Sequence, residues 1–264
     1  MTASPFNRCN IPPWVIASHH FNKNPQRLEI QGVRQSNRLL FERLAKLPSR
    51  ELRGLQFHDY MDVYFQLHQW QQEGSSSSRK SLKNSYLRFL RGWMFESNSR
   101  EGAVLKGWVE SRFGLPPSFH RQPIEDIHSE AYDHYLKERM QGMARTSAIE
   151  AQFDLLYEFT QFELGLLQPQ SNSITLYRGI NDFNEQRILQ KLEKNRHRIR
   201  LNNLVSFTTD FERAWEFGNR VLQTEAPLVK IVFRADLLPN ALLTGEEEVM
   251  VIGGEYDVKV LTGG

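Results

Sequence analysis

Three short stretches of the chain place polar side chains near the ends of apolar segments. They read ITLYRG from residue 174, LVSFTTD from residue 204 and GEEEVMVI from residue 245. Apolar residues that alternate with a period of two are typical of β-strands, in which successive side chains point to opposite faces. We therefore expect each stretch to be a strand that carries chemically useful groups at one end.

The first stretch carries an arginine on a face that should be buried. The period of two places Arg178 on the same side of the strand as Ile174 and Leu176. A buried guanidinium needs an anion, and it matches the oxygens of a phosphate or a carboxylate in a bidentate manner. An isolated arginine of this kind more often pairs with a structural carboxylate than with a substrate. Arg178 alone therefore leaves both interpretations open.

The second stretch carries hydroxyl groups. Ser206 and Thr208 are two residues apart, so they project to the same side, where they could orient other polar groups in a cleft. Hydroxyl side chains that precede a helix also serve in turns and caps, and Asp210 is the predicted cap of a short helix over 211–217. This pattern alone favours the structural interpretation.

The third stretch carries consecutive carboxylates that run directly into a strand. The alternation puts Glu246 and Glu248 on the side of Met250, with Glu247 opposite. An acidic run is usually solvated. Like charges this close to an apolar strand are costly, however, unless they meet a cation or a developing positive charge. The pair is therefore a candidate for chemistry in which a cation is bound or formed.

Taken in this order, the arginine, the hydroxyl strand and the E-x-E pair resemble the R-S-E signature of arginine-specific mono-ADP-ribosyltransferases. The chain also resembles the dinitrogenase reductase ADP-ribosyltransferase family over nearly its whole length, through NRCNIPPWVIAS, LRFLRGWMFES and REGAVLKGWVESRFGLPP as well as the three stretches. The resemblance implies an α+β fold, with a helical N-terminal region packed on a C-terminal mixed or antiparallel split β-sandwich. It also implies an enzyme that splits NAD, places ADP-ribose on an arginine of dinitrogenase reductase, the nitrogenase iron protein, and so inactivates nitrogenase.

The resemblance further implies which residues bind NAD. Arg178 would hold the NAD phosphate or ribose, and the backbone of Gly179 would bond the nicotinamide carboxamide. The usual middle motif is S-T-S, whereas this chain offers Ser206, Thr208 and Thr209 in SFTT, so either Ser206 or Thr208 could be the structural hydroxyl. The mechanism of the family requires no metal.

The two acids would divide the chemistry between them. Glu248 would stabilise the positive charge that spreads over the ribose when nicotinamide leaves, and would bond the ribose 2′-hydroxyl. Glu246 would position the acceptor guanidinium and take a proton from it. In the wider family an E-x-E pair, rather than Q-x-E, indicates an arginine acceptor.

Two parts of the chain must position these residues. In the first part, apolar residues recur every three or four positions, which predicts helices separated by polar loops. The helices are expected over 40–47, 57–67, 82–93, 131–140 and 149–167. One of the loops, over 74–80, is serine-rich and should be exposed. After a turn at 169–172, alternation predicts strands near 174–178, 204, 229–233, 250–252 and 256–260, with helices over 188–192 and 211–217. We expect residues 1–168 to form a helical cap and partner-docking region continuous with the 169–264 core in one compact enzyme. The tryptophans of the helical part, Trp70, Trp93 and Trp108, are typical of core packing.

Composition limits the other possibilities. The formal net charge of +2 is too small to predict a nucleic-acid or membrane partner, and the basic cluster over 196–200 is interpreted as a solvated helix end. The single cysteine, Cys9, cannot form an internal disulfide, and we find neither zinc-ligand spacing, a membrane span nor an export signal, so we expect a cytoplasmic protein. The family resemblance adds a PII signal protein as a regulatory partner. The alternatives are transfer to another protein's arginine, NAD hydrolysis, or a non-catalytic module that binds NAD or the iron protein.

Overall fold

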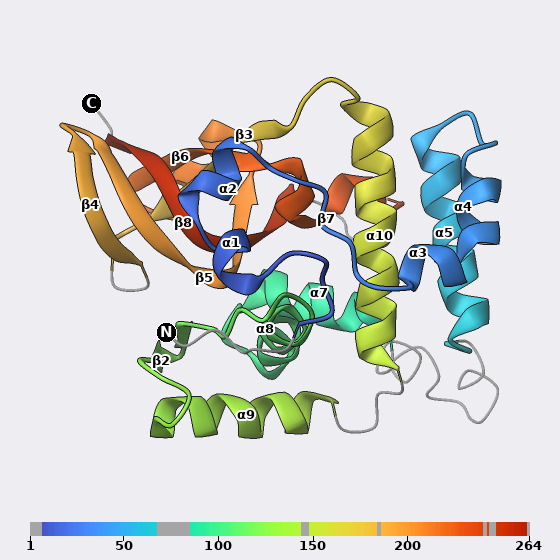
Figure 1. The fold of residues 1–264 in the computed structure, drawn as a ribbon, viewed down its shortest axis with the longest axis horizontal. Helices are drawn as coiled ribbons and strands as arrows, with labels where there is room; N and C mark the ends of the chain where they lie inside the picture. The colour runs from blue at the N-terminus through green and yellow to red at the C-terminus, as the bar shows by residue number, and fades with distance from the viewer. Residues whose placement is uncertain are drawn as a thin grey trace.

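In the computed structural model, the chain forms mainly helices up to residue 167 and a six-stranded antiparallel sheet after it (Figure 1). The structure describes residues 7–67, 85–143, 148–183, 186–239, 242 and 247–262. The helices are α1 (Pro13–Ile16), α2 (His19–Lys23), α3 (Val33–Ser36), α4 (Arg38–Leu44), α5 (Arg50–Tyr64), α7 (Tyr86–Phe95), α8 (Arg100–Phe113), α9 (Glu130–Met143), α10 (Ile149–Leu167) and α11 (Phe211–Trp215), with 3-10 turns η3 (Leu228–Lys230) and η4 (Ala235–Leu237). The strands are β1 (Phe119–His120), β2 (Gln122–Pro123), β3 (Ser173–Ile180), β4 (Arg187–Glu193), β5 (Arg196–Thr208), β6 (Arg220–Pro227), β7 (Ile231–Arg234) and β8 (Glu248–Thr262).

Strands β5 and β8 form the centre of the sheet. They pair in antiparallel fashion from Arg196 opposite Lys259 to Thr208 opposite Glu248. The first part of β8 also pairs with β7 and its last part with β6. Strand β3 pairs along β6 and touches β5 at a single pair near the end of that strand. These pairings connect β3, β6, β8 and β5 in a closed circuit, so the sheet curls back on itself.

The two faces of β5 and β8 belong to different hydrophobic clusters. Leu204 and Met250 pack in the larger cluster, which they share with the helices, whereas Val205 packs in a second cluster within the curled sheet. Ser206 and Glu248 lie two residues from Leu204 and Met250, respectively, so the alternation of a strand directs both toward the helices. The fold therefore turns these two polar side chains toward the helical part.

The helical part is tied to the sheet from several directions (Figure 1). In α10, Tyr157 donates a hydrogen bond to the carbonyl of Val229 at 2.7 Å, and Gln161 bonds two further carbonyls of the η3 and β7 segment. The N-terminal segment crosses β8, where the amide of Glu255 donates to the carbonyl of Ala17 at 2.7 Å. Gly254 at this crossing has a φ of +114°, a conformation that glycine adopts most readily.

The structure confirms the predicted α+β class with an antiparallel C-terminal sheet, and most of the individual elements. The helices expected from the three- and four-residue spacing are present as α4, α5, α7, α9 and α10, and the capped helix after Asp210 is α11. The strand expected near 229–233 is shorter, because Val229 lies in η3. The two strands expected over 250–252 and 256–260 are one continuous strand, β8. The predicted loop at 74–80 lies outside the described residues.

Two predictions are wrong. Residues 188–192 form part of strand β4 rather than a helix, and the basic cluster over 196–200 lies in strand β5 rather than at a helix end. Irregularities in the β4–β5 register, between Ile188 and Gln190 and between Lys191 and Glu193, interrupt the period of two. An extra residue in a strand shifts the apolar spacing toward three, which imitates a helix. The cluster also includes Arg198, which is not simply solvated, because it binds Asp257 on β8 through two hydrogen bonds.

Candidate active site

The end of β3 brings an arginine to the end of β5. Tyr177 pairs with Thr208, and the next residue, Arg178, donates a hydrogen bond from Nη1 to the carbonyl oxygen of Ser206 at 2.9 Å. Arg178 is half-buried and lies on the same strand face as Leu176, which is fully buried. Two of the stretches that the sequence singled out therefore meet.

A triangle of short hydrogen bonds connects β5, β8 and α7. Ser206 Oγ donates to Glu248 Oε1 at 2.6 Å. The indole Nε1 of Trp93 donates to the same oxygen at 2.6 Å and to Ser206 Oγ at 2.8 Å. Trp93 is 2% exposed, whereas Ser206 and Glu248 are half-buried. The third stretch thus joins the other two, and a tryptophan of the helical part completes the group.

The hydroxyl group of Thr208 has a different partner. Its Oγ1 accepts a hydrogen bond from the amide of Asp210 at 3.1 Å, and the carboxylate of Asp210 accepts from two amides at the start of α11. Thr209 is exposed just beyond the end of β5. Of the two candidate hydroxyls, Ser206 is the one that bonds Glu248, whereas Thr208 belongs to the turn that begins α11.

Gly179 is the point at which α11 approaches β3. A Cβ atom at this position would collide with the carbonyl oxygen of Ala214 and would meet the side chain of Phe217 at 3.0 Å. The absence of a side chain therefore serves helix packing next to Arg178. The predicted bond from the Gly179 backbone to a carboxamide stays a prediction.

Glu246 lies outside the described residues, so its predicted position beside Glu248 stays a prediction. Its neighbour Glu247 is exposed, consistent with the expected alternation. On the other side of this segment, the carbonyl of Leu242 accepts a hydrogen bond from Arg91 Nη2 at 2.7 Å. Arg91 lies on α7, so this helix contacts the chain both before and after the acidic segment.

A small cavity opens beside the triangle. It is lined by Trp93, Ser97, Asn98, Lys106, Phe119, Arg178, Gln186, Asn202, Leu204, Val205 and Ser206. Gln186 is 8% exposed, and its amide oxygen has no hydrogen-bond partner among the described residues. A buried acceptor without a partner is costly, so a ligand that donates a hydrogen bond would be favoured here.

A buried lysine also lines this cavity. Lys106 is 1% exposed, and its Nζ donates to Asn98 Oδ1 at 2.9 Å and lies 3.4 Å from His120 Nδ1. Burial, reinforced by the charge of Lys106, lowers the pKa of His120 to about 4. The imidazole is therefore neutral at neutral pH, and its Nε2 lies 2.6 Å from Glu138. Together with Arg178, the cavity has two basic residues in its lining and suits an anionic ligand.

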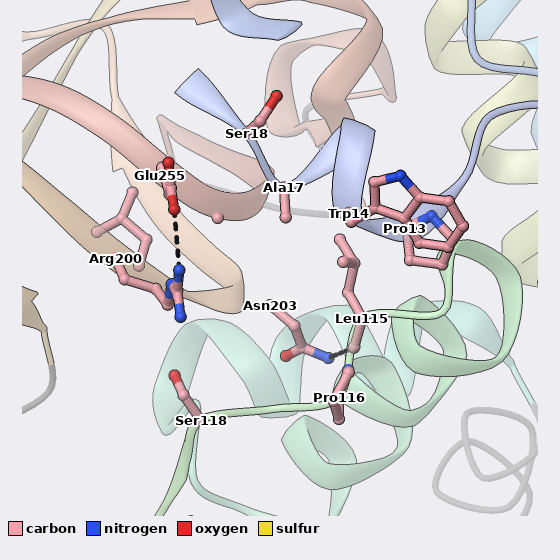
Figure 2. A pocket seen from close by; sticks show the side chains of 12 residues that line it. Pro13, Trp14, Ala17, Ser18, Leu115, Pro116, Ser118, Arg200, Asn203 and Glu255 are labelled. Carbon is pink, nitrogen blue, oxygen red and sulfur yellow. Dashed lines mark hydrogen bonds and ion pairs between the residues drawn. The ribbon is translucent and has the colours of Figure 1, made fainter. Parts of the chain in front are cut away.

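A second cavity lies along the same strands and shares no lining residue with the first (Figure 2). Its wall includes Trp14 and Pro13 on one side and the ion pair between Arg200 and Glu255 on the other, with 2.8 Å between Nη2 and Oε1. None of the site residues predicted from the sequence lines it. We therefore place the candidate site at the first cavity, which we call the Glu248 cavity because Glu248 bonds two residues of its lining, Ser206 and Trp93.

Sequence reasoning missed Trp93 and Lys106. Trp93 falls in the apolar period of α7 together with Tyr86 and Phe89, which predicts core packing, and the ring does lie in the main core. The signal that could have identified it is its indole N–H, which needs an acceptor once the ring is buried.

Within the described ranges, no three or more His, Cys, Asp or Glu side chains gather as they would around a metal ion. The described helices also include none that is long and apolar enough to cross a membrane.

Comparison with known proteins gives two matches. The family model for dinitrogenase reductase ADP-ribosyltransferase matches residues 6–260. A relative from Rhodospirillum rubrum, NAD(+)--dinitrogen-reductase ADP-D-ribosyltransferase, is 43% identical over 257 residues, which is 96% of this chain and 93% of the relative. No solved structure matches the chain.

Proposed function

The chain belongs to the dinitrogenase reductase ADP-ribosyltransferase family, and we propose on this basis that it transfers ADP-ribose from NAD to an arginine of dinitrogenase reductase. NAD is the donor substrate, and nicotinamide is the leaving group. The observation that carries the assignment of the site is the Glu248 carboxylate, which Ser206 and Trp93 hold beside a cavity that contains Arg178.

The proposed reaction breaks the bond between C1′ of the ribose and the nicotinamide nitrogen. The bonding electrons leave with nicotinamide, whose ring becomes neutral, and positive charge spreads over the ribose. A fixed carboxylate stabilises this charge more in the transition state than in the ground state, which is the condition for catalysis. We assign this role to Glu248, whose orientation is set by two hydrogen bonds before any substrate arrives.

The acceptor side of the reaction needs a proton acceptor. A guanidinium keeps its proton at all relevant pH values, so its nitrogen attacks C1′ only when a base receives the proton. We assign this role to Glu246. Arg178 holds a phosphate or ribose oxygen of NAD, and the backbone of Gly179 bonds the carboxamide. Thr209 lies at the exposed edge of the site, and Thr208 supports the site indirectly through the turn into α11. We infer further that the enzyme works in the cytoplasm, that its activity responds to a PII signal protein, and that residues 1–168 carry the docking surface.

The test uses the purified protein, purified dinitrogenase reductase and NAD labelled in the adenylate part. We expect label on one arginine of the acceptor protein, with one nicotinamide released for each label. Glu246→Gln should lose transfer to arginine but keep NAD hydrolysis, because only the acceptor step needs that base. Nicotinamide release by the wild-type protein without labelled acceptor would assign the protein as an NAD glycohydrolase, and absence of both would make it a non-catalytic binding module.

A further inference from the structure

We propose that Trp93 is a positioning residue for the catalytic carboxylate, so that helix α7 of the helical part belongs to the catalytic machinery. This inference rests on the proposed function, because it assigns Trp93 a task in the reaction that Glu248 performs. The indole of Trp93 bonds Glu248 and Ser206 but carries out no chemical step itself.

The geometry fixes the carboxylate in one orientation. The N–H of Trp93 and the hydroxyl of Ser206 approach the same oxygen, Oε1 of Glu248, both at 2.6 Å. Two donors from different directions hold the rotation of the carboxylate group and thereby the direction of its second oxygen. Both donors are neutral groups, and together they fix the orientation of this oxygen. An oriented charge that needs no reorganisation during the reaction is the main source of electrostatic catalysis.

Burial holds the indole ring of Trp93 in one position. Trp93 is 2% exposed, and α7 buries the neighbouring Leu90 and Phe89 in the main core. The ring is therefore held by packing as well as by its hydrogen bonds, and it has only two side-chain torsions to fix. A rigid donor places the carboxylate within the small tolerance that catalysis requires. The packing of α7 thus determines the geometry on β8.

The same helix holds the chain at the other side of the acidic segment. Arg91, two residues before Trp93, binds the carbonyl of Leu242, whereas Trp93 binds Glu248. Residues 242 and 248 flank the segment that contains Glu246. A displacement of α7 would therefore move residues 242 and 248 together.

Trp108 provides a matched control. It lies on the adjacent helix α8, is fully buried, and also donates its indole N–H to a carboxylate, Asp154 Oδ1, at 2.7 Å. Asp154 belongs to a network with Arg112 away from the Glu248 cavity. The two tryptophans therefore make the same kind of bond, but Asp154 is also paired with Arg112, and only Trp93 bonds the catalytic residue.

The experiment compares Trp93→Phe with Trp108→Phe, which keep an aromatic ring and remove the donor. For Trp93→Phe we expect kcat to fall about tenfold in both transfer and NAD hydrolysis, with KM for NAD changed by less than about twofold. Loss of a donor to the ionised carboxylate should also move the acid limb of the pH–rate profile to higher pH. Trp108→Phe should lower the melting temperature but leave kcat and the pH profile unchanged. A Trp93→Phe protein with wild-type kcat, or one whose only defect is a lower melting temperature, would overturn the positioning role.

A second measurement avoids variants of Trp93 that fail to fold. In protein labelled with ¹⁵N-tryptophan, the indole N–H resonance of Trp93 should move when Glu248 is changed to Gln, whereas that of Trp108 should stay in place. An unchanged Trp93 resonance would overturn the contact on which the inference depends. Absence of any transfer or hydrolysis by the wild-type protein would instead overturn the proposed function, while the indole resonance would still report the contact.

Discussion

Strand β8 carries two glutamates, Glu248 and Glu255, along the segment that pairs with β5, and the two glutamates have different partners. Glu248 accepts hydrogen bonds from two neutral donors, the hydroxyl of Ser206 and the indole of Trp93. Glu255 accepts from a cation, Arg200, at 2.8 Å. The two neutral donors fix the orientation of Glu248, whereas the cation at Glu255 also pairs with its charge. The same pair of strands thus supports two carboxylates that are held in different ways.

The contacts of Glu255 connect strand β8 to the N-terminal helices. Burial alone would raise the pKa of Glu255, but the hydrogen bonds from Arg200 and His19 and the charge of Arg200 outweigh burial and lower it. Its backbone carbonyl accepts a hydrogen bond from Asn22 Nδ2 at 2.8 Å. This glutamate therefore fastens the N-terminal helices to the sheet.

The largest expected effect comes from neutralising each glutamate in turn. Glu248→Gln should lower kcat for transfer by about 10²–10³-fold, the usual loss when a preorganised electrostatic group is removed. Glu255→Gln should keep kcat within about threefold, because it lies outside the reacting region, but should lower the melting temperature. Steady-state kinetics and thermal unfolding of both variants provide the comparison. Equal losses of kcat in the two variants would erase the distinction between the two ends.

Removal of the hydroxyl that orients Glu248 should have a smaller effect. Ser206→Ala should lower kcat by about tenfold, as expected for the loss of one hydrogen bond to a charged group. Thr208→Val serves as the control, because Thr208 bonds the Asp210 amide instead. It should change kcat by less than about threefold and mainly weaken the cap of α11. The reverse ranking in single-turnover assays would assign the structural hydroxyl to Thr208.

A buried lysine near the Glu255 end should affect stability but not transfer. Burial lowers the pKa of Lys230 from its usual 10.5 to about 7, so the folded protein binds this proton less tightly than the unfolded chain. The stability of the wild-type protein should consequently rise with pH between 7 and 10.5, and the penalty should be complete below pH 7. Lys230→Met should therefore add about 1–2 kcal/mol at pH 6.5 and progressively less toward pH 10. Denaturant unfolding at several pH values measures this, and a gain that does not vary with pH would contradict it.

The smallest expected effect concerns the Arg200 and Glu255 ion pair. Arg200→Gln should cost less than about 1 kcal/mol, because both side chains are partly exposed. Since the folded pKa of Glu255 is lowered, the stabilisation is present above its usual value of 4.5 and is lost as the pH falls through the lowered value. The melting temperatures of wild type and variant should therefore converge in acid. A difference in melting temperature that grows in acid would show that the ion pair is not the source of the stabilisation.

Alternation along the strands was sufficient to predict the sheet side of the site. It placed Arg178 on a buried face and Glu248 on the face of Met250, and the structure has both arrangements. Which hydroxyl meets Glu248 could not be predicted, because Ser206 and Thr208 share a strand face. The choice depends on the turn into α11, where Thr208 is engaged by a backbone amide.

The helical side of the site could not be predicted from periodicity. Trp93 satisfies the apolar spacing of α7, and nothing in that pattern distinguishes a tryptophan that only packs from one whose N–H reaches a strand 155 residues later. The same limit explains the error at 188–192, because bulges between β4 and β5 changed the local spacing. The apolar spacing of a segment reports neither the register with its neighbouring strand nor the acceptor that a buried indole finds far along the chain.

The most direct test of the central claim is a crystal structure of the Glu248→Gln variant with NAD. We predict that the nicotinamide ribose lies against residue 248 and Ser206, with a phosphate or ribose oxygen within hydrogen-bond distance of Arg178. NAD bound instead in the cavity of Figure 2, between Trp14 and the Arg200 and Glu255 pair, would contradict the account.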